Sequence, residues 1–566
     1  MKRIMNQDMK NSLRTILVLI SFVVTVSTFA QPSAIKKLAD ATFTLMTFKE
    51  DGSILSSSNG FFISADGVCV SPWKPFIGAS RAVVIDNKGQ KHNVEALMGA
   101  NGIYDIVKFQ IQSSTTPAAL ATNVTANSNA WIVTTSKSYP PAKAMVTKVE
   151  KFMEKYNYSV LTTDVDDKLN GAIVANDKGQ VIGLYSSNNS IKSATDAAFA
   201  RDFVISGLSQ NDLTLRECAI RVALPASVEE ATIALMLSAD KSESYRDGAI
   251  KEFLGKFPTL NDGYLANANL LITKNDFANA DKTLRDAIAK AQAKDEAHYN
   301  YARTIYICMV NPSIEPQLKS LGWTLDKAMS EAEKAYKIKA EPQYRHLQAQ
   351  IIYSKGDYEK AYKEFEALTT TPLKNPEIYL EMAQCKQQLK SDDKEILGLL
   401  NQSIELCDTP YVKTAAPYFL ARAKQLDKMG DYRLAMKDYY TYEYFYRGQL
   451  GPEFYYMREQ CEAKGKLWKQ ALQDILIASR LDPKEPIYCA EAGSLLLRVN
   501  KLDAAIDAAK QAIKLKPDFA EAYLILGSAQ CQNKQKEEGI KNIQKAKELG
   551  NQQADSFLCK FKNEVQ

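Results

Sequence analysis

The C-terminal half of the chain repeats with a fixed period, and no other feature of the sequence restricts its fold as much. Pro483 and Pro517 stand 34 residues apart, and so do Gly493 and Gly527. Each period contains two helical patterns separated by a short turn. A single helical hairpin cannot bury its apolar face alone, so such units stack on one another. The period therefore predicts an array of helical hairpins.

An alanine in the second helix of each unit gives the register of the array. Its positions are Ala280, Ala328, Ala361, Ala435, Ala471 and Ala505, and Gly539 takes its place in the last unit. The interval of 74 residues after Ala361 leaves room for a divergent unit that starts near Pro376. The interval of 48 residues after Ala280 predicts an insertion around 311–323. We expect about eight repeats from Asn261 onward, in an all-α domain over residues 225–566.

The period of 34 residues, the small residues of the first helix, the alanine of the second helix and the closing proline together resemble the tetratricopeptide repeat. The resemblance implies a superhelix whose concave groove binds extended or helical protein segments. In that family, positions of the first helix line the groove. These positions map to Leu265, Asn269, His346, Gln350, Leu380, Gln384, Leu420, Lys424, Tyr456 and Gln460. The lysine/asparagine clamp that some of these domains use for a C-terminal carboxylate is absent from the sequence, which argues against a chaperone tail as the ligand.

A tyrosine-rich segment, residues 439–446, lies on and beyond one of the second helices. At helical spacing Tyr439 and Tyr442 are core positions, and the other aromatic side chains cannot all be buried. Two interpretations stay open. The segment is either a tyrosine-rich seam between repeats or a source of aromatic anchors for a partner.

The N-terminal half, residues 35–212, shows short β patterns with turns between them. The predicted strands are Phe61–Ser64, Val68–Ser71, Arg81–Asp86, Gln90–Leu97, Tyr104–Ile111, Ala130–Thr135, Ala144–Phe152, Tyr158–Thr163, Ala172–Ala175 and Val181–Ser186. The turn sequences at 65–67 (ADG) and 87–89 (NKG) predict two hairpins. Many short strands at such spacing are typical of a β-sandwich or a β-barrel.

Three segments of this half resemble the landmarks of the trypsin-like serine peptidases, especially their bacterial periplasmic branch. Residues 58–79 (SNGFFISADGVCVSPWKPFIGA) fit the segment around the catalytic histidine, but the histidine position falls on Lys74. Residues 104–109 (YDIVKF) place Asp105 at the position of the triad aspartate. Residues 168–183 fit the segment around the nucleophilic serine, whose position falls on Asn170. The resemblance implies an all-β, trypsin-like double barrel over residues 35–212.

The residues at the triad positions predict a domain without triad catalysis. The chemistry needs a hydroxyl nucleophile and a base that takes its proton. Asn170 has no nucleophilic oxygen, and a protonated Lys74 cannot accept a proton. Cys69 lies nearby in the sequence, but no histidine accompanies it. Lys74 and Asp105 either form a salt bridge that keeps the old cleft shaped for a peptide, or Asp105 accepts from backbone donors while Lys74 is solvated.

Residues 1–30 have the pattern of a secretory signal. Four basic residues precede an apolar run, Ile16 to Val26, and Thr28-Phe29-Ala30 offers small residues at the two positions that a signal peptidase reads. We expect cleavage after Ala30 and export, with the periplasm as the expected location. An outer-membrane-associated or secreted protein, or an uncleaved N-terminal anchor, are the alternatives.

Composition excludes some classes of function. The net charge is +5, and removing residues 1–30 would leave about +2, which gives no basis for binding nucleic acid or anionic lipid. The nine cysteines are scattered without CxxC or metal-ligand spacing. We therefore expect no metal and no cofactor.

These patterns together predict an exported, non-catalytic scaffold in which a degenerate trypsin-like domain precedes the repeat array. Its partners would be protein or peptide segments bound in the repeat groove. The alternatives are a divergent trypsin-like serine endopeptidase and an accessory subunit of a membrane-associated complex for outer-membrane assembly or secretion.

Overall fold

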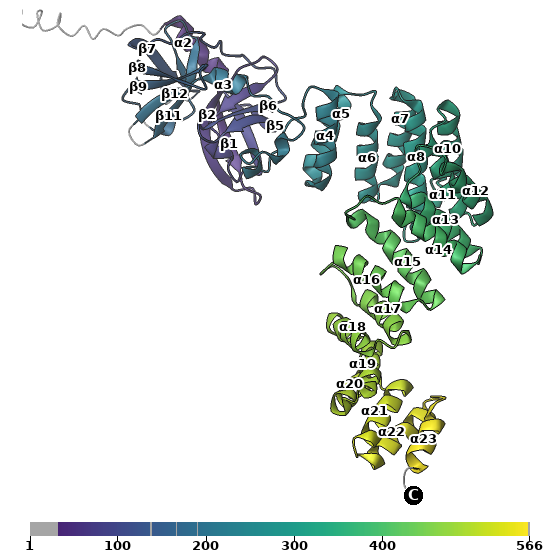
Figure 1. The fold of residues 1–566 in the computed structure, drawn as a ribbon. Helices are drawn as coiled ribbons and strands as arrows, with labels where there is room; N and C mark the ends of the chain where they lie inside the picture. The colour runs from purple at the N-terminus through teal and green to yellow at the C-terminus, as the bar shows by residue number, and fades with distance from the viewer. Residues whose placement is uncertain (1–31, 136–138, 166, 189–190, 564–566) are drawn as a thin grey trace, which may run out of the picture. The chain divides into compact units, whose positions relative to one another are not determined.

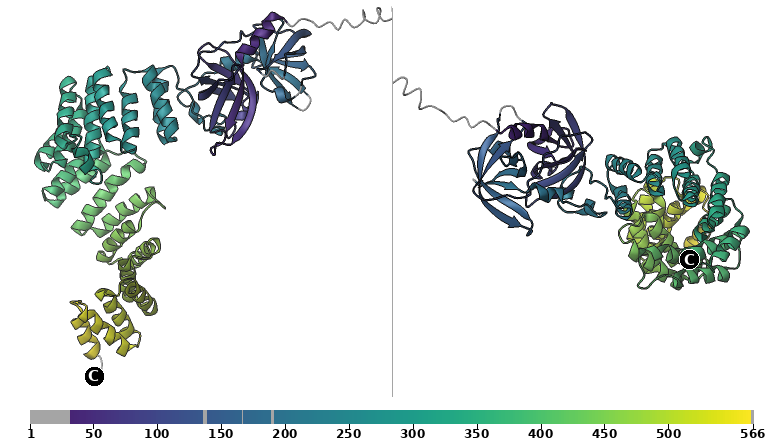
Figure 2. Two further views of the ribbon diagram at one scale, coloured as in Figure 1. Left: turned by 180° about the vertical axis from the view of Figure 1, so that it is seen from behind. Right: turned by 90° about the horizontal axis from the view of Figure 1, so that it is seen from above.

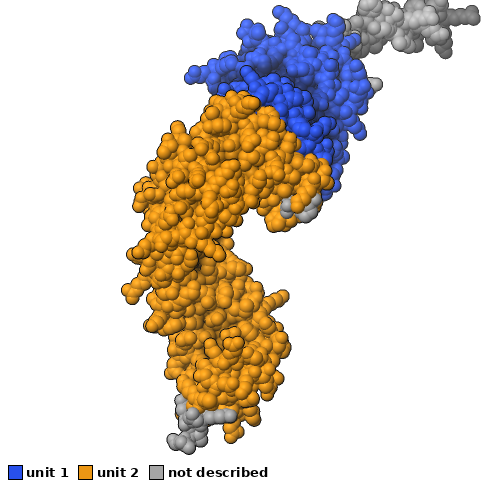
Figure 3. All heavy atoms as spheres, turned by 90° about the vertical axis from the view of Figure 1, so that its right-hand side faces the viewer, with its two compact units in different colours: residues 1–297 blue, residues 298–566 orange. Residues whose placement is uncertain are grey.

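The structure, a computed structural model, describes residues 32–135, 139–165, 167–188 and 191–563. Two compact units meet between Ala297 and His298 (Figure 3). The first unit contains all of the described β structure and the first helices, and the second contains the remaining helices. The predicted signal sequence, residues 1–30, lies outside the described residues.

Six antiparallel strands close the first barrel in the order β1-β2-β3-β6-β5-β4 (Figure 1). They are β1 (Thr42–Phe48), β2 (Ile54–Phe62), β3 (Val68–Ser71), β4 (Arg81–Asp86), β5 (Lys91–Asn101) and β6 (Ile106–Ile111). Both predicted hairpins are present, since β2 pairs with β3 and β4 pairs with β5. Gly67 turns the first hairpin with a φ of 92°, a conformation that side chains other than that of glycine rarely adopt.

The second barrel has the same strand order as the first. Its strands are β7 (Ser128–Val133), β8 (Ala142–Phe152), β9 (Tyr156–Thr162), β10 (Ile173–Ala175), β11 (Val181–Asn188) and β12 (Ile191–Thr195). Read from β7, the closed order is β7-β8-β9-β12-β11-β10, which repeats the path of β1 to β6. The prediction of an all-β double barrel is confirmed, and this arrangement is compatible with a trypsin-like fold.

Each barrel has its own core, and a third cluster joins the two barrels. Phe43 and Phe109 lie at the centre of the first core, and Tyr185 lies in the second. The third cluster brings together side chains of both barrels, of α2 (Ser33–Leu38) and of α3 (Ala197–Arg201). Burial of this shared apolar surface fixes the two barrels against each other.

Four helices still belong to the first unit or begin there. They are α4 (Val228–Leu237), α5 (Glu243–Lys256), α6 (Asn261–Thr273) and α7 (Phe277–Lys290). Glu252 of α5 forms an ion pair with Arg221 and accepts the backbone N–H of Leu224 over 3.1 Å. Lys256 donates to the Leu224 carbonyl over 2.6 Å. These bonds attach α5 to the segment that follows the barrels, while the predicted domain limits, 212 and 225, stay predictions.

The helices from α6 onward follow one another in the chain as first and second helices of successive units (Figures 1 and 2). Those of the second unit are α8 (Lys294–Met309, which begins in the first unit), α9 (Glu315–Lys319), α10 (Leu325–Ile338), α11 (Pro342–Ser354), α12 (Tyr358–Leu368), α13 (Pro376–Gln388), α14 (Asp393–Glu405), α15 (Ala416–Met429), α16 (Tyr432–Phe445), α17 (Pro452–Lys464), α18 (Trp468–Leu481), α19 (Pro486–Arg498), α20 (Leu502–Leu515), α21 (Ala520–Gln532), α22 (Lys536–Glu548) and α23 (Ala554–Asn563). The short α9 occupies the place of the predicted insertion, and α13 begins at Pro376 as expected. The predicted all-α repeat array is thus confirmed.

The alanine register describes the packing within each hairpin. Each predicted alanine is the fourth residue of its second helix and is fully buried, and Gly539 is buried at the same place in α22. Ile396 holds this position in the divergent unit formed by α13 and α14. Small side chains here let the two helices of a hairpin approach closely. Several first helices begin with a proline, which lacks the N–H that the first turn could not satisfy.

Two further observations concern the whole described chain. Within the described ranges, no helix is long and apolar enough to cross a membrane. All nine cysteines are free thiols, and six of them are buried.

Candidate functional site

Lys74 and Asp105 lie close together at one end of the first barrel. Lys74 begins a 3₁₀ turn after β3, and Asp105 directly precedes β6. The backbone N–H of Lys74 donates to Asp105 Oδ1 over 2.8 Å, whereas Lys74 Nζ lies 3.9 Å from Asp105 Oδ2. The Lys74 side chain is 67% exposed, so solvent screens this ion pair. The geometry favours the second interpretation above, in which Asp105 accepts from the backbone and Lys74 is solvated.

Asn170 belongs to a contact between the barrels. Its Oδ1 accepts the backbone N–H of Ser187 over 2.7 Å, and its carbonyl oxygen accepts from Asn59 Nδ2 over 3.1 Å. A Cβ on the next residue, Gly171, would lie 2.3 Å from the Asn59 carbonyl oxygen. The segment at the nucleophile position therefore packs directly on β2, and the Asn170 side chain acts as a hydrogen-bond acceptor there.

Other side chains that could replace a triad are engaged or inert. Cys69 is fully buried in β3, and burial raises the pKa of its thiol well above the usual value. Each of the three histidines contacts a carboxylate in the structure: His92 with Asp86, His298 with Glu331 and His346 with Glu381. In the described part of the chain, no group of three histidine, cysteine or acidic side chains is placed to hold a metal ion.

The ten predicted groove residues all lie on first helices of the array. Leu265 and Asn269 lie on α6 in the first unit, and the other eight lie on α11, α13, α15 and α17 in the second. Asn269 and Lys424 are exposed, and the other predicted residues are half-buried. Such partial exposure suits side chains on the open face of a hairpin.

Glu381 of α13 brings His346 and Gln350 of α11 together. His346 Nε2 lies 2.5 Å from Glu381 Oε2, and Gln350 Nε2 donates to Glu381 Oε1 over 2.7 Å. Burial lowers the pKa of His346, but the hydrogen bond and the charge of Glu381 outweigh burial and raise it overall. This part of the face is therefore held by contacts within the protein. Sequence reasoning did not select Glu381, although it lies on a predicted groove helix.

The tyrosine-rich segment divides between packing and exposure. Tyr439 is fully buried, and the Tyr442 ring lies 5.4 Å from that of Phe454 on the next first helix. Tyr440 and Tyr444 are exposed. The structure thus supports a seam between α16 and α17 for part of the segment and leaves two rings accessible.

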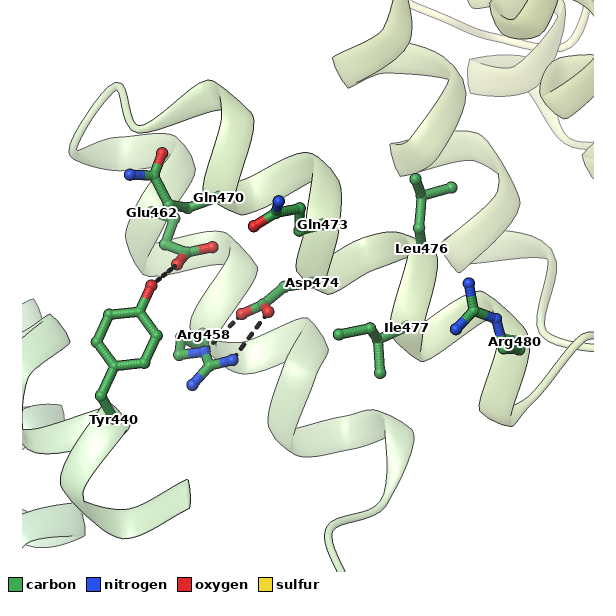
Figure 4. Close-up of a pocket in the computed structure, with 9 residues that line it drawn as sticks. All are labelled: Tyr440, Arg458, Glu462, Gln470, Gln473, Asp474, Leu476, Ile477 and Arg480. Atoms are coloured by element: carbon green, nitrogen blue, oxygen red, sulfur yellow. Dashed lines mark hydrogen bonds and ion pairs between the residues drawn. The ribbon is translucent and has the colours of Figure 1, made fainter. Parts of the chain in front are cut away.

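A pocket of about 360 Å³, here called the α16–α18 pocket, lies beside this seam (Figure 4). Arg458, on its floor, donates to both oxygens of Asp474 over 2.6 and 2.9 Å. The same fork joins Arg422 to Asp438 one unit earlier, over 2.7 and 2.8 Å. Because the fork recurs between the first and second helices of neighbouring hairpins, it is a structural clamp of these repeats.

Two buried carboxyl groups on α17 lie beside the clamp. Tyr440 donates to Glu462 over 3.3 Å, and burial together with Asp474 raises the pKa of Glu462. Gln460 donates to Glu459 over 2.7 Å, and burial together with Glu491 raises the pKa of Glu459 to about 7. One oxygen of each carboxyl group is buried without a hydrogen-bond partner among the described residues. Both groups therefore favour the protonated form far more than an ordinary glutamate does.

A larger cavity, about 540 Å³, opens on the first helices at the end of the array. We call it the α19–α21 cavity. Its polar side chains include Glu491 and Ser494 of α19 and Glu521 and Ser528 of α21. Its apolar walls include Phe519, Leu524 and Phe557, and Tyr456 of α17 stands at one end, where its ring lies 5.3 Å from that of Tyr488.

The repeat register explains which residues line the α19–α21 cavity. Moving forward from Tyr456 and Gln460 by 34 residues reaches Ala490 and Ser494, and a further 34 reaches Leu524 and Ser528. All four of these residues line the cavity. Of the ten predicted residues, Tyr456 alone is a lining residue of this cavity. The signal that finds the others is the same period, applied to the last two units.

The comparisons with known proteins agree with this register. Residues 491–554 match the tetratricopeptide repeat family. The chain is also 29% identical over 130 residues to the small glutamine-rich tetratricopeptide repeat-containing protein 2 of Mycosarcoma maydis. That alignment covers 23% of this chain and 29% of the relative. The matched family segment contains α21 and α22 and most of α19, which places tetratricopeptide sequence on two walls of the cavity.

Proposed function

We propose that this protein is an exported, non-catalytic scaffold that binds segments of other proteins along the first helices of its repeat array. Tetratricopeptide repeats typically bind protein or peptide partners, and the match at 491–554 supports the same role here. The observation that carries the proposal is the α19–α21 cavity. A volume of about 540 Å³, open on the first-helix face, accommodates a few side chains of a peptide segment.

The β-barrels support a structural or binding role in this proposal. Lys74 and Asn170 stand at the base and nucleophile positions, and neither can perform the corresponding step. Asn170 is hydrogen-bonded within the contact between the barrels. No particular observation favours the divergent-peptidase alternative.

Photo-crosslinking in living cells tests the proposal. A photoreactive phenylalanine derivative at Ile487, which lines the cavity and is 42% exposed, is expected to crosslink to a protein partner. The control is the same derivative at Leu481 of α18, which is 50% exposed and does not line the cavity. Crosslinking at neither site, or equally at both, would contradict a binding role for this face. The purified chain is expected to begin at Gln31, and an intact Met1 would contradict export.

A further inference from the structure

The α19–α21 cavity has more negative than positive charge. Glu491 and Glu521 come from neighbouring first helices, and neither carboxylate makes a hydrogen bond or an ion pair with a described residue. Burial and the charge of Glu521 raise the pKa of Glu491, although Arg498 opposes this shift. Arg498 is the cationic side chain of the lining, and its guanidinium lies 5.0 Å from the centroid of the Trp468 ring. Two carboxylates thus repel each other across a space that one arginine only partly neutralises.

The cavity also contains an unpaired polar atom. The hydroxyl of Ser528 is buried without a hydrogen-bond partner among the described residues, and the residue is 1% exposed. A buried hydroxyl without a partner costs about 1–3 kcal/mol. Ser528 lines the cavity on the same helix face as Glu521. A donor group that entered the cavity would both pair this oxygen and reduce the repulsion between the carboxylates.

The apolar walls limit the kind of donor that fits. Phe519, Leu524 and Phe557 surround the polar groups, so an occupant must present apolar surface as well as a cation. The side chains of lysine and arginine have this composition, with an apolar stem and a charged end. A cavity of about 540 Å³ holds one such side chain together with an apolar neighbour, not a folded domain.

We propose that the α19–α21 cavity recognises a lysine or arginine side chain of a partner segment, with its cation between Glu491 and Glu521 and an adjacent apolar side chain against Phe519 and Phe557. This inference rests on the proposed function, because it names the chemistry of the segment that the array binds. It predicts that acidic segments are rejected, since they would add a third negative charge to the cavity.

A random peptide library displayed on phage, selected against the full-length protein, is the probe. The selected peptides are expected to share a lysine or arginine next to an aromatic or aliphatic residue. A synthetic peptide with the selected sequence is then measured by fluorescence anisotropy. The double substitution Glu491→Gln and Glu521→Gln is expected to weaken its binding about tenfold or more. Glu537→Gln, at an exposed position of α22, is the matched control and should leave the dissociation constant unchanged.

The peptide supplies a second measurement that does not depend on a variant of the protein. Replacing its basic residue by the uncharged norleucine should weaken binding to the wild type and should make binding insensitive to the two glutamine substitutions. If the peptides lack basic residues and ignore these substitutions but lose binding with Tyr456→Ala, the inference is wrong and the proposed function stands. If no peptide is selected, or if binding survives Tyr456→Ala as well, both are wrong.

Discussion

Asn170 and Lys74 show how two substitutions change the chemistry of a site while its framework is kept. Asn170 accepts the Ser187 N–H over 2.7 Å and so has a place in the packing of the second barrel. Lys74 keeps its backbone bond to Asp105, as a residue at this corner of the barrel can do with any side chain. The hydrogen bonds that shape the corner thus need neither a histidine nor a serine.

The first prediction at this scale concerns reactivity. Fluorophosphonate probes require a serine that a neighbouring base activates, and the triad positions provide neither group. We expect no labelling of the purified protein under conditions in which trypsin is labelled fully. Labelling that disappears when a serine of residues 32–212 is replaced by alanine would show a peptidase site that this account lacks.

The second prediction concerns the buried carboxyl group of Glu459. Its pKa is raised from 4.5 to about 7 in the folded chain by burial and by Glu491. Between these pH values the folded state holds a proton that the unfolded chain has released, so the free energy of unfolding falls as the pH rises from about 4.5 to about 7. Glu459→Gln has no such proton to lose.

Thermal unfolding at several pH values measures this effect. The variant Glu459→Gln is expected to equal the wild type near pH 4 and to be more stable by about 1 kcal/mol or more at pH 8. Glu537→Gln, at an exposed position, should show no difference at either pH. A gain for Glu459→Gln that is the same at both pH values would contradict the raised pKa.

At the scale of elements, two glycines at the same repeat position have different surroundings. A Cβ on Gly527 of α21 would lie 2.6 Å from the Gly539 carbonyl oxygen of α22. A Cβ on Gly493 of α19 would lie no closer than 3.2 Å, to the Ile525 side chain. The last hairpin is therefore packed too closely to accept a methyl group, while the preceding one is not.

Alanine substitutions at the two positions test this difference. Alanine favours a helix over glycine by about 1 kcal/mol, so Gly493→Ala should be neutral or stabilising. Gly527→Ala should destabilise α21 and α22 by about 1–3 kcal/mol because the helices must move apart. Hydrogen exchange of the amides of residues 520–548 reports the effect locally. Equal protection in the two variants would mean that the close approach of α21 and α22 is wrong.

Sequence patterns were informative where they were local or periodic. The alanine register located the second helices, and the two turn sequences located two hairpins of the first barrel. β12 (Ile191–Thr195) was outside the predicted strands because its sequence contains lysine, serine and threonine. Its burial follows from closure of the barrel by pairing with β9 and β11, which no local pattern reveals.

The candidate site was harder to predict than the fold. The 34-residue period implied the face that Tyr456 and Ser528 share, but not where that face is hollowed. The α19–α21 cavity depends on the sizes of side chains from three neighbouring helices, and the isolation of Glu491 and Glu521 depends on which cations fail to reach them. Glu381 was not selected for the same reason, since its role lies in the contact between α11 and α13.

At the scale of the whole molecule, the account assigns binding to the repeat array and no chemistry to the barrels. The two compact units each have hydrophobic clusters of their own, so a substitution at the barrel cleft leaves the first-helix face of the last repeats in place. This separation allows the two candidate sites to be tested in one full-length chain.

The most direct test is the dissociation constant of a peptide that covers the partner segment crosslinked at position 487. It is measured with the wild type, with Tyr456→Ala, and with the double variant Lys74→Ala and Asn170→Asp, in which the aspartate still accepts the Ser187 N–H. Loss of an aromatic anchor costs about 2 kcal/mol, so Tyr456→Ala should raise the dissociation constant about thirtyfold. The barrel variant should stay within about twofold of the wild type. A dissociation constant that rises in the barrel variant and not in Tyr456→Ala would place the binding site in the barrels and contradict the account.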